Sequence, residues 1–171
     1  MFGFNTINSK INSALINNAR KPTFLNLSNM KKVLILFTYK DWNEIYEIVK
    51  DLERNGKEVI LWTIYPLRSE KTEMSLPSNV RVITQKEISK WKGLSTSIVD
   101  EFKKLEYDTL LDVTTKDDKT FHYLLASNSA KFCIGIREQR LKFFDFTLLK
   151  DDDVNLEETY KQLKNYLNNM C

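Results

Sequence analysis

The polar residues best suited to chemistry follow two apolar runs of this 171-residue chain. Asp41 follows the run 33–37, and Thr114, Thr115 and Lys116 follow the run 108–113. If both runs are neighbouring parallel strands, their carboxyl ends meet at a crevice of the kind that binds ligands. There Asp41 could act as a general base. The hydroxyls, backbone amides and ammonium of 114–116 could receive a phosphate or a carboxylate.

Four further residues complete this predicted site. Tyr39 and Lys40 stand in the same turn as Asp41, Asp112 lies within the second apolar run, and Arg137 follows the run 131–136. Arg137 could reach an anion at the sheet edge or remain solvated.

The acidic residues have structural alternatives that are more common than ligand binding. Asp41 could simply cap the helix that it opens. A buried carboxylate such as Asp112 needs hydrogen-bond partners, which Thr114 or Thr115 could supply. The residues 114–116 could equally form a solvated turn. The sequence leaves these alternatives open.

Several kinds of chemistry are disfavoured by composition. No glycine occurs between residues 37 and 41, and no GxxxxGK[ST] motif occurs, so the usual routes to NAD and ATP binding are absent. Only Cys133, Cys171 and one histidine, His122, are present, which disfavours a zinc site or a disulfide scaffold. We therefore expect no metal and no cofactor.

The charge balance and the hydropathy pattern limit the kinds of partner that we expect. Twenty-six Lys and Arg residues against 23 Asp and Glu residues give a net charge of +3, which does not by itself predict nucleic-acid binding. No apolar run approaches the ~18 residues of a membrane helix, so no membrane span is expected. We expect a cytoplasmic protein.

Strand-like apolar runs alternate with segments of helical periodicity, which indicates an α/β fold. We expect a three-layer, Rossmann-like architecture with a mainly parallel sheet of about five to six strands, ordered 3-2-1-4-5. The expected strands are 33–37, 58–64, 80–84, 108–113, 131–136 and 143–149. The expected helices begin near residues 41, 95, 118 and 155. The stretch 65–79, with two prolines and no apolar face, predicts a loop.

The chain divides into a basic helical arm, 1–31, and a single domain, 32–171. No Asp or Glu precedes Asp41, and apolar residues at helical spacing predict an amphipathic helix over 5–20. Its composition favours a packing or interaction helix over a targeting peptide. This helix, or the apolar segment Phe143–Leu149, could also serve a homodimer interface.

The stretch 32–136 resembles the amino-terminal half of heptosyltransferase-type glycosyltransferases of the GT-B class. The matching segments are Lys32–Phe37, Asp41, 58–62, 107–112 and 124–135. The resemblance implies a Rossmann-like half-molecule in which Asp41 takes the place of the family's proposed catalytic base. Lys40 replaces a glycine of that family, and the half that binds the sugar nucleotide has no counterpart here. The resemblance thus implies a module that needs a partner for glycosyl transfer.

Nearly the whole chain is also similar to a small uncharacterised bacterial family of similar length. The similarity is carried by Trp91, Gly93, Phe102, 107–112, Ala130, Lys131, Gly135 and Phe144–Phe146. This similarity implies the fold and no activity.

Our leading interpretation is a module that is not catalytic alone and whose crevice could hold a small polar or phosphorylated molecule. The alternatives are a sugar- or nucleotide-acting enzyme with Asp41 as base, and a homodimeric scaffold protein.

Overall fold

The computed structural model describes residues 6–67, 73–89 and 93–170, and it contains a parallel sheet in the order β3-β2-β1-β6-β7-β8. This order confirms the α/β, Rossmann-like prediction, with the sixth strand added beyond the fifth. The strands of this sheet are β1 (Lys32–Thr38), β2 (Glu58–Ile64), β3 (Val80–Ile83), β6 (Thr109–Asp112), β7 (Phe132–Gly135) and β8 (Phe146–Thr147). All five strand pairs are parallel, so every strand points its carboxyl end toward the same edge.

Strand β1 lies inside the sheet, between β2 and β6, and both of its faces are covered. Its middle residues, 33–37, are all at most 1% exposed. An unbroken aliphatic run suits a strand covered by helices on both sides, because no face needs to be polar. Ile35 pairs with Leu61 of β2 and with Leu111 of β6, which places the carboxyl ends of these three strands side by side.

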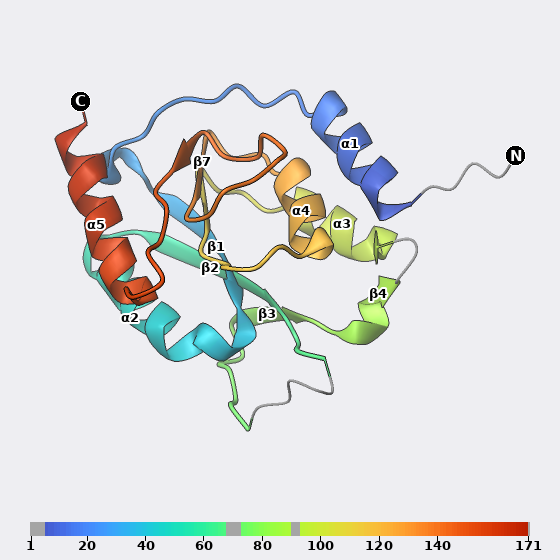
Figure 1. The fold of residues 1–171 in the computed structure, drawn as a ribbon, viewed down its shortest axis with the longest axis horizontal. Helices are drawn as coiled ribbons and strands as arrows, with labels where there is room; N and C mark the ends of the chain where they lie inside the picture. Colours follow the sequence, from blue (N-terminus) through green and yellow to red (C-terminus); the bar gives the residue numbers. More distant parts are fainter. Residues whose placement is uncertain (1–5, 68–72, 90–92, 171) are drawn as a thin grey trace, which may run out of the picture.

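The helices form two layers (Figure 1). Helices α2 (Trp42–Arg54) and α5 (Leu156–Asn169) cover one face, whereas α1 (Ile7–Asn17), α3 (Thr96–Lys103) and α4 (Lys119–Ala126) cover the other. Each face has its own apolar core, because alternate residues of the strands point to opposite sides. Ile35 and Phe37 belong to the first core, and Leu34 and Leu36 to the second.

The structure differs from the expected strands in two places. The apolar stretch 143–149 forms a strand only at Phe146–Thr147 (β8), because Phe143 turns into the core on the α4 side. A short antiparallel pair of strands, β4 (Ile88–Ser89) and β5 (Gly93–Leu94), precedes α3 and lies outside the expected strands. The described parts of the expected loop, 65–67 and 73–79, contain no regular helix or strand, and residues 68–72 lie outside the described ranges.

Helix α2 begins without the expected side-chain cap. Asp41 occupies the N-cap position, but its carboxylate accepts no hydrogen bond from the helix. A single 3₁₀ turn, Tyr39–Asp41, joins β1 to α2 instead. By contrast Asp118 accepts from the amide of Thr120, and Asn155 accepts from the amide of Glu158, as capping requires.

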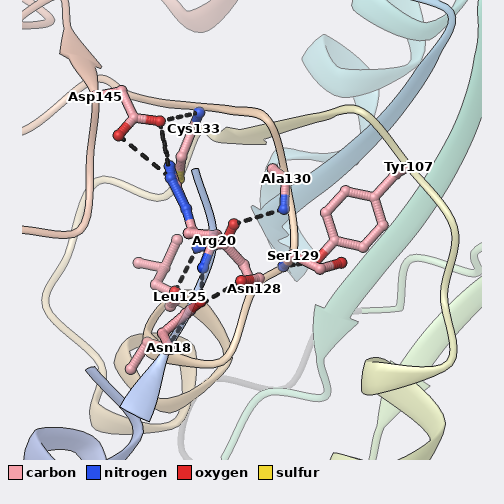
Figure 2. Close-up of polar contacts among 10 residues, drawn as sticks. Asn18, Arg20, Tyr107, Leu125, Asn128, Ser129, Ala130, Cys133 and Asp145 are labelled. Atoms are coloured by element: carbon pink, nitrogen blue, oxygen red, sulfur yellow. Dashed lines mark hydrogen bonds and ion pairs between the residues drawn. The ribbon is translucent and has the colours of Figure 1, made fainter. Parts of the chain in front are cut away.

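The amino-terminal segment is fastened to the end of α4 and to Asp145 by polar contacts (Figure 2). The Asn18 amide donates to the carbonyls of Ala126 and Asn128, at 2.9 Å each. The Arg20 guanidinium pairs with the Asp145 carboxylate, which also accepts from the Cys133 amide at 2.8 Å. Helix α1 packs against α4 and buries Ile11 to 2% exposure. Residues 6–31 are therefore held by specific polar contacts as well as by apolar packing.

The two surfaces predicted for a homodimer differ in the apolar side chains that they expose. Leu149 is half exposed and Ile16 of α1 is 83% exposed, whereas Phe143 is buried. A homodimer through either surface stays a prediction.

Candidate functional site

A pocket of about 260 Å³ lies at the carboxyl ends of β1, β2 and β6, where the sequence predicts the crevice. We call it the rim pocket. Its lining comes from the end of β1 (38–40), the end of β2 (64–67), the turn 114–118, Gln85 and Phe121. The strand order reverses at β1, since β2 and β3 lie on one side of it and β6, β7 and β8 lie on the other. This is the place where open parallel sheets bind ligands.

Tyr39 forms one wall of the rim pocket and does not close it. Its ring is 7% exposed, and its hydroxyl donates to the Met74 carbonyl at 2.9 Å. Burial is the main cause that raises the pKa of Tyr39, so the phenol remains protonated and acts as a donor.

The second wall is polar and carries two ammonium groups. Lys40, Thr115 and Lys116 are exposed and line the pocket. Within residues 6–67, 73–89 and 93–170, neither Lys40 nor Lys116 forms an ion pair. In the same ranges the backbone amides of Thr115 and Lys116 donate no hydrogen bond. These groups can all donate to an anion.

Asp41 stands beside this wall and not among the residues that line it. Its carboxylate is partly buried and accepts no hydrogen bond from any group in the described ranges. Burial raises the pKa of Asp41, and Lys40, Lys150 and Lys116 oppose that rise while Glu44 adds to it. The Asp41 carboxylate therefore lies within electrostatic reach of three lysines and of Glu44.

Asp112, Thr114 and Arg137 bind one another beneath the pocket. One Asp112 oxygen accepts from the Thr114 amide at 2.9 Å and from its hydroxyl at 2.6 Å, and the other accepts from Arg137 Nη2 at 3.1 Å. Asp112 is fully buried and the Arg137 side chain is 9% exposed. Burial raises the pKa of Asp112, although Arg137 and Thr114 oppose the rise. Their arrangement gives these three side chains a structural role in joining the ends of β6 and β7.

The acidic residues of the pocket wall are also engaged. The Asp117 carboxylate accepts from Arg137 Nη1 and from Gln139 Nε2, both at 2.8 Å, and these contacts lower the pKa of Asp117. Asp118 caps α4. His122 Nε2 lies 3.4 Å from an Asp117 oxygen but has no hydrogen-bond partner within the described residues, so this contact is electrostatic only.

The apolar wall of the pocket was missed from the sequence. Ile64, Tyr65, Pro66 and Leu67 continue from the end of β2, and Phe121 faces the same hollow from α4. The available signal was that β2 neighbours β1, so the residues that follow β2 must also reach the ligand-binding edge. The prolines and charges of 65–79 indicated only a loop.

Among the described residues, no group of His, Cys, Asp and Glu is arranged to hold a metal ion. No helix in the described ranges has the length and apolarity needed to cross a bilayer. Burial raises the pKa of the Cys133 thiol far above its usual range, so this cysteine is not a reactive thiolate.

A larger surface groove of about 670 Å³ lies between α1 and the end of α4. Serine and asparagine side chains dominate its lining, and Arg20, one of its cations, is already paired with Asp145. Its size alone does not indicate chemistry, and we place the candidate site at the rim pocket, where apolar and cationic groups converge.

A protein family described as a family of unknown function (DUF6913) matches residues 4–170, so the chain belongs to this family. No curated protein and no solved structure matches the chain. The similarity to glycosyltransferases consequently has no support from these comparisons.

Proposed function

We propose that this member of the DUF6913 family binds a small anionic molecule in the rim pocket and does not transform it alone. The proposal is carried by one observation. Lys40 and Lys116 face a pocket whose own acidic residues are already engaged by other partners.

The partners of the acidic residues at the strand ends support an anionic ligand. Asp117 is paired with Arg137, and Asp118 serves α4. Asp41 is the carboxylate that remains, and burial disfavours its ionised form. An entering phosphate or carboxylate would meet two ammonium groups, those of Lys40 and Lys116, which form no ion pair within the described residues, and this favours its binding.

The backbone adds directional donors to this charge. The turn 114–118 begins at a fixed point, because Asp112 holds both the amide and the hydroxyl of Thr114. Thr115 and Lys116 follow that point and are exposed residues, and their amides donate no hydrogen bond within the described ranges. Fixed amides need little reordering when a ligand binds, so less entropy is lost.

A thermal-shift titration of the full chain with ribose 5-phosphate and with inorganic phosphate tests this proposal. A ligand present at about 100 times its Kd should raise the Tm by roughly 5–10 °C. Lys116→Ala should weaken binding by about tenfold or more, because it removes a charged donor. Lys131→Ala is the matched control, since Lys131 is an equally exposed lysine at the opposite end of the sheet.

The proposal fails if neither anion raises the Tm, or if Lys116→Ala and Lys131→Ala reduce the shift equally. Equal reduction would mean that the anions bind through the net charge of the protein and not in the rim pocket.

The uncommitted carboxylate of Asp41 favours a second candidate, an enzyme acting on a sugar or nucleotide with Asp41 as general base. The supporting observation is that Asp41 neither caps α2 nor accepts a hydrogen bond within the described ranges. Product formation from a sugar nucleotide by the wild-type chain, lost in Asp41→Asn with ligand affinity retained, would establish it. Absence of product from the wild-type chain at saturating substrate would reject it.

A further inference from the structure

The two walls of the rim pocket differ in chemistry. The wall from β1 and the turn 114–118 carries ammonium groups and amides, whereas the wall that continues β2 carries Tyr65, Pro66 and Leu67. Tyr65 is 37% exposed and Leu67 is 57% exposed, so apolar surface faces water beside the cationic wall. Exposed apolar groups next to convergent polar groups are typical of a ligand site.

Tyr65 is held by two hydrogen bonds of its backbone and by one contact of its ring. Its backbone amide donates to the Ile83 carbonyl at 2.8 Å, and its carbonyl accepts from Gln85 Nε2 at 2.7 Å. The ring meets that of Tyr39 edge to face, with centroids 5.3 Å apart. Tyr39 is itself anchored to the Met74 carbonyl. A ring fixed in this way offers a flat surface at little cost in conformational entropy.

We infer that the ligand of the rim pocket carries a planar ring as well as its anionic group, as a nucleoside monophosphate does. The ring packs on Tyr65 and the phosphate lies against Lys40 and Lys116. This inference rests on the proposed function, because it concerns the same pocket. The volume of about 260 Å³ lies just below the usual range of small-molecule pockets, which favours a compact ligand such as a mononucleotide over a dinucleotide.

Isothermal titration calorimetry of the full chain with AMP, ribose 5-phosphate and adenosine tests the inference. AMP carries both features, whereas ribose 5-phosphate lacks the ring and adenosine lacks the phosphate. We expect AMP to bind at least about tenfold more tightly than either, since a base stacked on an aromatic ring adds about that much affinity.

A pair of tyrosine variants assigns the gain to one side chain. Tyr65→Ala should bring the affinity for AMP down to that for ribose 5-phosphate, and it should leave the affinity for ribose 5-phosphate unchanged within about twofold. Tyr46→Ala should change neither affinity, because Tyr46 is a comparably exposed tyrosine on α2, outside the pocket.

Equal affinities for AMP and ribose 5-phosphate would overturn the inference and leave the proposed function standing. The same holds if Tyr65→Ala weakens both ligands alike. If neither phosphorylated ligand binds, or if adenosine binds as tightly as AMP, the proposed function falls as well.

Discussion

Arg137 Nη2 lies 3.1 Å from Asp112 Oδ2 in a setting where Asp112 is fully buried. Arg137 comes just beyond β7 and Asp112 ends β6, so the pair joins two neighbouring strands where both stop. Thr114 completes the arrangement, since its carbonyl accepts from Arg137 Nε at 3.1 Å. The turn that forms the cationic wall of the rim pocket therefore starts from a fixed support.

The first prediction concerns this pair. Arg137→Leu should lower the free energy of unfolding by about 3 kcal/mol, because a buried carboxylate loses its charged partner. Urea denaturation at neutral pH measures the change. Arg140→Leu is the control, and as a substitution of an exposed arginine it should cost less than about 0.5 kcal/mol. A similarly small cost for Arg137→Leu would contradict the structural role.

The second prediction concerns pH. Burial is the main cause that lowers the pKa of His122, and Arg137 adds to it, although Asp117 and Asp112 oppose it. The unfolded chain therefore binds a proton at His122 more readily than the folded chain does. The contribution of neutral His122 to the stability of the fold is present above pH ~6.5 and is lost as the pH falls.

His122→Phe should remove this contribution while keeping an aromatic ring against Phe143. Between pH 7 and pH 5 the wild-type chain should lose more stability than His122→Phe, measured by urea denaturation at each pH. Identical pH profiles for the two chains would refute the assignment.

The third prediction compares two glycines. A Cβ at Gly135 would overlap the ring of Phe144, whereas a Cβ at Gly56 would meet no atom within 4 Å. Gly135→Ala should therefore cost about 1–3 kcal/mol through overpacking. Gly56→Ala should cost about 1 kcal/mol, because the positive φ of 75° disfavours a side chain. Phe144→Ala should relieve most of the cost at Gly135 and none of the cost at Gly56.

The fourth prediction concerns the amino-terminal segment. Arg20 is 12% exposed at its side chain and pairs with Asp145. Arg20→Ala should lower the free energy of unfolding by about 1.5 kcal/mol, the usual value for a charged hydrogen bond. It should also speed hydrogen exchange of the Thr23 amide, which bonds the Lys131 carbonyl at 2.7 Å. Lys21→Ala, at an exposed neighbour, should affect neither quantity.

The fifth prediction separates a cap from an uncommitted carboxylate. Asn155→Ala should cost about 1 kcal/mol, because Asn155 caps α5. Asp41→Asn should not lower stability at pH 7, since Asp41 caps nothing and burial disfavours its charge. A loss of 1 kcal/mol or more in Asp41→Asn, measured by urea denaturation, would show that Asp41 holds the fold.

The order of the sheet was predictable because it depends on features that are local in sequence. An unbroken run such as 33–37 requires cover on both faces, and helical segments between such runs require parallel strands. The extent of the sixth strand was not predictable in this way. Phe143 and Phe146 are equally apolar, and only tertiary packing sends the first to the α4 side and the second to the α5 side.

The position of the site was predictable from the sequence, but the roles of its residues were less so. The strand ends bring Lys40 and Lys116 to one pocket, as the alternation of strands and helices indicates. For Arg137 and Asp112 the sequence left ligand binding and a structural role open, and the structure shows that they bind each other. Sequence spacing cannot distinguish these outcomes, because the pairing joins residues 25 positions apart across two strands. Whether the pocket holds a ligand stays a prediction.

The carboxylate of Asp145 has one more consequence, for the behaviour of the protein at high concentration. It holds the amide of Cys133, a β7 group that would otherwise face outward before β8 begins. The amino-terminal segment covers the adjoining carbonyl of Lys131 through Thr23. Open backbone groups at a sheet edge recruit strands from other molecules and lead to aggregation. These two contacts thus shield a vulnerable length of the sheet margin from self-association.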